Sequence, residues 1–295
     1  MITTNVKANK IAFKIHLLFA IGLLNINAQE VRNVKGPIEY SFDSSKETEL
    51  KAFVFMPDEI NPVSNYPAIV IFHGGGWSIG DPSWAFGIAE KYARKGLVAV
   101  AAQYRLSDQK SITPVDAMED ARNAILWMRE NSIELRIDKE RIAAYGWSAG
   151  AHLAACAAVF YSANSEKNIN SIPNALVLVS PGLSIINDNW FKQLLMNESD
   201  PYICSPAENL KENMPPSIIV VGKDDTVTPI FGSNLFHQNM LKHGNRSQLF
   251  IYDGVGHLFT PSDQPDDGYP NPDKETQSKA YDEIDKFLKE LKYIE

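Results

Sequence analysis

Short apolar runs that alternate with helical segments constrain the fold of this chain more than any other feature. Runs such as Ala68–Phe72 and Ala175–Val179 carry no charge, which is typical of strands buried on both faces of a sheet. The segment Pro114–Met128 lies between two such runs and has helical spacing, with proline at its start. Strands that alternate with helices predict a mostly parallel sheet covered by helices on both faces.

About eight strands are expected. They are Ile38–Phe42, Leu50–Met56, Ala68–Phe72, Leu97–Ala102, Ile142–Tyr145, Ala175–Val179, Ile218–Val221 and Gln248–Tyr252. The first two alternate in places and predict a hairpin at a sheet edge. The expected helices are Trp84–Lys95, Pro114–Met128, Ala149–Phe160, about 229–242 and about 275–292.

The N-terminal segment differs from the rest of the chain. Three lysines precede an apolar stretch at Ile15–Leu24, and Ala28 provides a small residue for cleavage before Gln29. The apolar stretch is too short to span a bilayer. We therefore predict a signal peptide over residues 1–28 and an exported protein, periplasmic or secreted, without stable membrane insertion once the signal is removed. The alternative is an ordinary N-terminal helix.

Length, composition and charge fit one domain over residues 29–295. The chain of 295 residues has 44% hydrophobic and 22% charged residues, which excludes a disordered protein. Its net charge of −8 argues against nucleic acid or an anionic membrane as the main partner. Cys156 and Cys204 lack the spacing of a metal site, and Cys156 lies in an alanine-rich run that predicts a buried free thiol.

The motif Gly146-Trp147-Ser148-Ala149-Gly150 carries the clearest chemical signal. A serine hydroxyl is a weak nucleophile unless it is presented openly beside a base. A strained turn between a strand and a helix presents it in this way, and flanking glycines avoid steric clash there. The expected strand before the motif and the expected helix after it supply this context, so Ser148 is the candidate nucleophile.

A second glycine-rich motif, His73-Gly74-Gly75-Gly76-Trp77, follows the expected strand Ala68–Phe72. Attack on an ester places negative charge on the carbonyl oxygen, which aimed N–H donors must stabilise. We assign these donors to Gly75, Gly76 and Ala149. His73 is expected to brace the loop rather than to act as a base.

A base and its orienting carboxylate are expected downstream of the serine. His257 follows the last expected strand, and Asp224 and Asp225 follow the one before it. The chain order serine, aspartate, histidine is that of the strand–turn–helix hydrolases with this serine motif. His257 would take the proton of Ser148, and the aspartate would hold the imidazole tautomer. Of the remaining histidines, His152 is expected to serve packing.

Several motifs together resemble the bacterial hormone-sensitive-lipase-like esterases of the α/β-hydrolase superfamily. They are His73–Trp77, Gln103–Leu106, Asp138–Ile142 and Gly146–Ala154. The first and last are most similar to the acetyl-esterase and feruloyl-esterase-like branch. The resemblance extends over about residues 48–292 and favours Asp225 over Asp224 as the orienting residue. Trp147 departs from the histidine or aspartate that this branch often carries.

The resemblance implies hydrolysis of carboxylic esters through an acyl-enzyme, with no cofactor and no metal. Short acyl groups on a small molecule or a carbohydrate such as xylan are the implied substrates. The alternatives are a formamidase or small-amide hydrolase, a peptidase, and a catalytically silent binding module. The oligomeric state is unknown from the sequence.

Two irregular stretches have no assigned role. Residues 183–216 contain aromatic residues and predict either a lid or pocket wall or a surface excursion with a small satellite core. The segment between Val255 and Lys274 is rich in proline, aspartate and glycine. It either contacts a polar substrate or serves as a solvated connector.

Overall fold

The computed structural model describes residues 34–295 except for 46–47, 58–60, 62, 161–170 and 197–198. The predicted signal peptide therefore lies outside the described residues. Within this part, an eight-stranded sheet has the order β1-β2-β4-β3-β5-β6-β7-β8. The strands are β1 (Val34–Ser45), β2 (Thr48–Pro57), β3 (Tyr66–Phe72), β4 (Val98–Ala102), β5 (Ile137–Trp147), β6 (Ala175–Val179), β7 (Ser217–Gly222) and β8 (Ser247–Tyr252).

The directions of the strands match the expected architecture. The strands β4, β3, β5, β6, β7 and β8 pair in parallel, each with its neighbour in the sheet. At one edge, β1 and β2 form an antiparallel hairpin that joins the sheet through β4. The predicted sheet of about eight strands, mostly parallel and with an edge hairpin, is confirmed.

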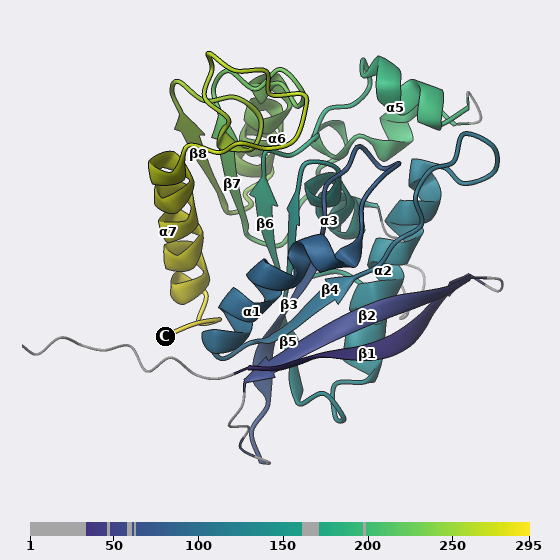
Figure 1. The fold of residues 1–295 in the computed structure, drawn as a ribbon, viewed down its shortest axis with the longest axis vertical. Helices are drawn as coiled ribbons and strands as arrows, with labels where there is room; N and C mark the ends of the chain where they lie inside the picture. The colour runs from purple at the N-terminus through teal and green to yellow at the C-terminus, as the bar shows by residue number, and fades with distance from the viewer. Residues whose placement is uncertain (1–33, 46–47, 58–60, 62, 161–170, 197–198) are drawn as a thin grey trace, which may run out of the picture. The chain divides into compact units, whose positions relative to one another are not determined.

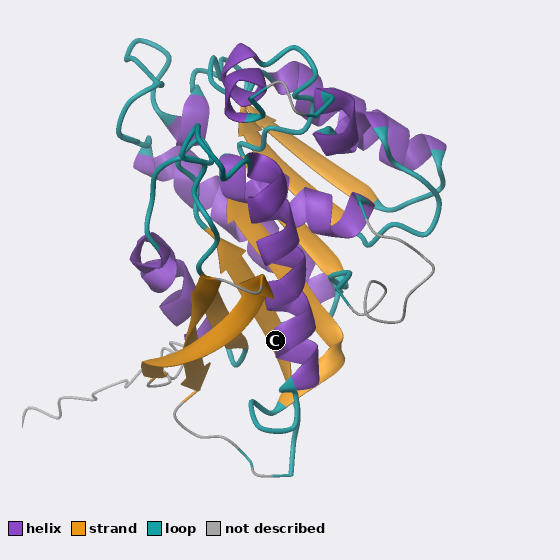
Figure 2. Cartoon of the chain, turned by 90° about the vertical axis from the view of Figure 1, so that its right-hand side faces the viewer, coloured by secondary structure: helices purple, strands orange, loops and turns teal. Residues whose placement is uncertain are grey.

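Helices cover both faces of this sheet (Figures 1 and 2). They are α1 (Phe86–Arg94), α2 (Pro114–Glu130), α3 (Ala149–Val159), α5 (Asn189–Leu194), α6 (Ile230–Lys242) and α7 (Lys274–Glu290). Buried residues of α1 and α7 form one apolar core with one face of the sheet, and those of α2, α3 and α6 form the other core. Every residue of α3 is buried, and its small alanine and glycine side chains let it lie close to the sheet.

Several predicted boundaries differ from the structure, among them the first strand, expected at Ile38–Phe42 and found over Val34–Ser45. The expected helix Trp84–Lys95 begins later, because a 3₁₀ turn at Pro82–Ala85 precedes α1. The expected strand Ile142–Tyr145 is longer, because β5 starts at Ile137 and includes a polar segment after it. Its pairing with β3 shifts register along this polar segment, which breaks the apolar pattern that sequence reasoning relied on.

The segment 183–216 packs against the main core. It contains α5 and two 3₁₀ turns, Pro201–Cys204 and Pro206–Glu208. Its buried apolar side chains, among them Leu183, Phe191 and Leu194, belong to the same cluster as α3. Of the two open alternatives, a surface excursion with its own satellite core does not hold for the described part of this segment. Among the described residues, no helix combines the length and apolar character needed to cross a membrane.

Candidate active site

Ser148 stands at the sharp turn between β5 and α3. Its backbone has φ 53° and ψ −123°, a strained conformation for a residue with a side chain. Its N–H donates to the carbonyl oxygen of Val179 at 2.9 Å, which fixes the turn on the neighbouring strand. A Cβ at Gly146 would overlap the Gly150 backbone, and one at Gly150 would overlap the backbone oxygen of Phe72. Both motif glycines are therefore required by close approach of the backbone.

The structure brings Ser148, His257 and Asp225 together as a hydrogen-bonded chain. The distance from Ser148 Oγ to His257 Nε2 is 3.0 Å, and His257 Nδ1 lies 2.9 Å from Asp225 Oδ2. All three residues are buried, with at most 8% of each exposed. A carboxylate on Nδ1 favours the tautomer that leaves Nε2 free to accept the serine proton. This arrangement can activate a serine hydroxyl for attack on an acyl carbon.

Backbone and hydroxyl donors hold Asp225 in place. Its Oδ1 accepts the N–H groups of Val227 at 3.0 Å and Thr228 at 2.7 Å. Thr228 Oγ1 donates to Asp225 Oδ2 at 2.9 Å. The side chain of Asp224 instead accepts from Ser262 Oγ at 2.6 Å, where it is exposed. The geometry thus places Asp225, rather than Asp224, against the imidazole.

Asp266 connects the loops that carry the base and its orienting carboxylate, and sequence reasoning missed it. Its Oδ2 accepts the N–H of His257 at 2.8 Å and the N–H of Thr226 at 3.0 Å. The hydroxyl of Thr226 donates to Oδ1 of Asp266. Burial would raise the pKa of Asp266, but these hydrogen bonds outweigh burial and lower it. The aspartate-rich segment after Val255 was the available signal. Part of that segment ties the active-site loops together.

The glycine-rich loop after β3 lies against the serine turn. Gly74 lies so close to Trp147 that a Cβ there would meet its indole ring at 2.8 Å. Gly75 and Gly76 have φ values of 126° and 54°. The carbonyl oxygen of Gly75 accepts from the N–H groups of Ser78 and Ile79 at 3.1 and 3.0 Å. These two bonds orient the peptide that carries the N–H of Gly76.

Ala149 is the third expected donor, and its position fits that role. It is the first residue of α3, so its N–H has no acceptor within the helix. The positive end of the helix dipole adds to its attraction for developing negative charge. Ala149 follows Ser148 directly, which places this donor beside the reacting hydroxyl.

His73 is buried, and its ring contacts the glycine loop and Tyr104. Its Nδ1 lies 2.6 Å from the carbonyl oxygen of Gly74 and 3.1 Å from Tyr104 Oη, and its ring stacks on that of Tyr104. Burial lowers the pKa of His73, which favours the neutral imidazole. These contacts fit the expected bracing role.

A second buried histidine ties the same loop to α3. Trp77 Nε1 donates to His152 Nδ1 at 3.1 Å, so His152 Nε2 carries its proton and donates to the carbonyl oxygen of Cys204 at 2.7 Å. Burial lowers the pKa of His152 to about 4. His152 was expected to serve packing only, but it joins three segments that are distant in sequence. Cys156 and Cys204 are buried free thiols.

Helix α5 contacts the glycine loop through two consecutive residues. Trp190 Nε1 donates to the carbonyl oxygen of Gly76 at 3.1 Å. The ring of Phe191 meets that of Trp77 edge-on, with centroids 4.9 Å apart. The segment 183–216 therefore supports the loop that carries the expected oxyanion donors, although its sequence has no motif that predicts this contact.

The described residues contain no group of three or more histidine, cysteine, aspartate or glutamate side chains that could hold a metal ion.

Comparison with known proteins places this geometry in a family. The family model described as BD-FAE matches residues 54–240, more than half of the chain. A probable isoprenylcysteine alpha-carbonyl methylesterase of Arabidopsis thaliana is 25% identical over 222 residues, which cover 67% of this chain and 46% of the relative. An arylesterase of Saccharolobus solfataricus is 27% identical over 219 residues, which cover 68% of this chain and 70% of the relative. The chain spans about half the length of the methylesterases that it matches.

Solved structures agree with the sequence relatives. The apo form of esterase 2 from Thermogutta terrifontis has a TM-score of 0.76 and 30% identity, covering 90% of this chain and 97% of that chain. The same esterase is known with propionate or butyrate bound, and phosphonylated by sarin. These similarities show the α/β-hydrolase fold that the sequence predicted.

Proposed function

Because the chain belongs to the BD-FAE family, we propose that it is a serine carboxylesterase that hydrolyses short-chain acyl esters through an acyl-enzyme. The observation that carries this proposal is the buried chain of hydrogen bonds from Ser148 through His257 to Asp225. The relatives that are named as esterases support an ester as the bond that is cleaved.

The proposed reaction has two steps, acylation and deacylation. His257 Nε2 takes the proton of Ser148 while Oγ attacks the ester carbon, and the N–H groups of Gly75, Gly76 and Ala149 stabilise the resulting oxyanion. His257 then gives its proton to the departing alkoxide, which leaves the acyl-enzyme. Water attacks this acyl-enzyme with His257 again as base, and the carboxylic acid is released.

The acyl group is proposed to be short. Propionate and butyrate are bound in structures of the Thermogutta esterase, which supports acyl chains of three to four carbons here. Acylated carbohydrates such as acetylated xylan are proposed as one source of such esters. Two half-exposed tryptophans beside the glycine loop, Trp84 and Trp190, offer flat surfaces on which a sugar ring could lie.

Export is proposed from the first 28 residues, which have the layout of a secretory signal. N-terminal sequencing of the protein recovered outside the cytoplasm tests this. A mature protein that begins at Gln29 supports export, whereas an intact Met1 in the cytoplasmic fraction contradicts it.

The activity is tested with p-nitrophenyl acetate, butyrate and octanoate beside an acetylated xylan oligosaccharide. Ser148→Ala should lower kcat by about 10⁴- to 10⁶-fold. Ser278→Ala, an exposed serine on α7, should match the wild type. Cleavage of p-nitrophenyl acetate together with release of acetate from the oligosaccharide supports the full proposal. A preference for octanoate contradicts the short acyl group, and a wild type as inert as Ser148→Ala contradicts esterase activity.

A further inference from the structure

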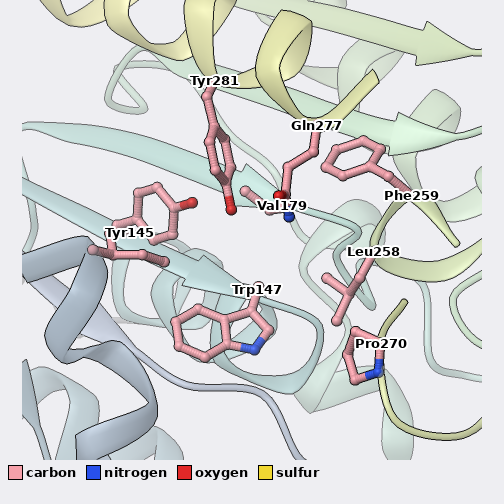
Figure 3. A pocket seen from close by; sticks show the side chains of 9 residues that line it. Tyr145, Trp147, Val179, Leu258, Phe259, Pro270, Gln277 and Tyr281 are labelled. Carbon is pink, nitrogen blue, oxygen red and sulfur yellow. The ribbon is translucent and has the colours of Figure 1, made fainter. Parts of the chain in front are cut away.

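A cavity of about 160 Å³ lies on the face of the sheet covered by α1 and α7 (Figure 3). The side chains that line it include Trp147, Val179, Leu258, Phe259, Gln277 and Tyr281. Val179 and Phe259 are buried, whereas the other four are half-buried. The cavity therefore has a buried floor and opens at the protein surface.

The lining is mainly aromatic and aliphatic. The hydroxyl groups of Tyr145 and Tyr281 interact with each other at one side of the cavity. In Figure 3, Gln277 extends from α7 toward Val179 and supplies a polar group at one wall. A dry apolar cavity of about 150 Å³ is known to accept benzene. The size and the lining thus suit one planar apolar ring.

The cavity lies directly beside the catalytic groups along the chain. Trp147 precedes Ser148, and the carbonyl oxygen of Val179 accepts the N–H of Ser148 at 2.9 Å. Leu258 follows His257, and its N–H donates to Ser180 Oγ at 3.1 Å. A ring in this cavity would therefore contact the residues that flank both the nucleophile and the base.

The position relative to His257 indicates which side of the ester the cavity receives. The departing oxygen must come within hydrogen-bond reach of His257 Nε2 to take its proton. Leu258 and Phe259 continue the chain from His257 and form one wall of the cavity. A departing group that leaves on the His257 side would therefore point toward this wall, whereas the carbonyl oxygen would face the glycine loop.

We propose that this cavity is the subsite for the alcohol side of the ester and that it accepts a single apolar ring, such as a phenyl group. This inference rests on the proposed esterase function. A sugar ring would have to bury hydroxyl groups against apolar walls here. The cavity therefore favours an aryl ester over an ester whose alcohol is a sugar.

The test compares three small esters with the purified full chain. Phenyl acetate places the ring on the alcohol side, methyl benzoate places it on the acyl side, and methyl acetate has no ring. Gln277→Trp fills the cavity from α7. Ser278→Trp introduces the same side chain at the adjacent exposed position and is the matched control.

Gln277→Trp should lower kcat/KM for phenyl acetate by about tenfold or more, with the other two esters changed less than about twofold. Ser278→Trp should change none of them. Phenol should inhibit methyl acetate hydrolysis competitively in the wild type and in Ser278→Trp, and more weakly in Gln277→Trp.

Three outcomes would overturn the inference: an equal loss on all three esters, a loss confined to methyl benzoate, or no inhibition of the wild type by phenol. Hydrolysis of methyl acetate reports the esterase function separately. If the wild type hydrolyses methyl acetate but Gln277→Trp shows no selective loss, only the alcohol subsite is wrong. If the wild type hydrolyses none of the esters, the proposed function itself fails.

Discussion

The indole N–H of Trp190 donates a 3.1 Å hydrogen bond to the carbonyl oxygen of Gly76. This bond fixes the peptide that follows Gly76. The N–H groups of Ser78 and Ile79 donate to the carbonyl oxygen of Gly75 and fix the peptide that precedes Gly76. Gly76 has no side chain to restrict its backbone, so its conformation depends on these contacts. Helix α5 thus positions a residue of the expected oxyanion hole without itself carrying a catalytic group.

Trp190→Phe should keep an aromatic ring in place and remove only the N–H donor. We expect kcat for a short-chain ester to fall about five- to tenfold with little change in KM, since the loss of one hydrogen bond costs about 1 kcal/mol. Tyr202→Phe, which removes an exposed hydroxyl from the same segment, is the control and should behave as wild type. A rise in KM at constant kcat would show that Trp190 binds substrate rather than orienting the loop.

Asp225→Asn and Asp224→Asn form a matched pair of neighbouring substitutions. The amide at 225 cannot stabilise the imidazolium or impose the correct tautomer, so kcat should fall by about 10⁴-fold. The side chain of Asp224 bonds Ser262 instead of His257, and its substitution should cost less than about threefold. Steady-state kinetics on p-nitrophenyl acetate would distinguish the two. Equal losses would contradict the assigned roles.

His152 predicts a specific dependence of stability on pH. Its folded-state pKa is lowered to about 4, below an unfolded value of about 6.5, so the unfolded chain binds more protons between these values. The free energy of unfolding should fall as pH decreases from about 6.5 to 4, by up to about 3 kcal/mol from this residue. Urea unfolding of wild type and His152→Gln across this range measures the effect.

The His152→Gln variant should be less stable at pH 7. Its free energy of unfolding should lack the part of the pH dependence that His152 causes. His243→Gln, at the end of α6 and outside the buried network, should retain the wild-type slope. Identical slopes for wild type and His152→Gln would mean that His152 does not remain neutral in the folded protein.

Gly150→Ala should abolish activity and destabilise the fold. Its Cβ would overlap the carbonyl oxygens of Phe72 and His73, so the serine turn would have to move away from the glycine loop. The control is Gly87→Ala in α1, where a Cβ meets nothing within 4 Å. This control should stabilise the protein by about 0.5–1 kcal/mol, because alanine is the better helix former. Thermal unfolding and the esterase assay check both variants.

The strands, the helices and the candidate triad could be predicted because each depends on local pattern. Apolar runs buried on both faces identify β3 and β6, and helical spacing with Pro114 at the first turn identifies α2. Where β5 carries a polar segment and shifts register, the pattern is lost and the predicted strand was too short.

The supporting contacts could not be predicted, since they join segments distant in sequence. Asp266 bonds the N–H of His257 and that of Thr226, 40 residues away along the chain. Trp190 reaches Gly76 across 114 residues. Neither residue belongs to a motif, and their roles depend on how loops at the ends of the parallel strands pack together.

The sequence by itself determined the nature of this protein: a parallel sheet, a serine turn between a strand and a helix, and a histidine and an aspartate in the right order after it. Backbone sterics, glycine placement and hydrophobic periodicity act over a few residues, and a sequence displays them directly. Tertiary structure alone decided that Trp190 and His152 hold the glycine loop, and that Gln277 and Trp147 border the same cavity. It also places against His257 the aspartate that the family resemblance favoured, Asp225. Those relationships depend on the packing of residues that only the folded chain brings together.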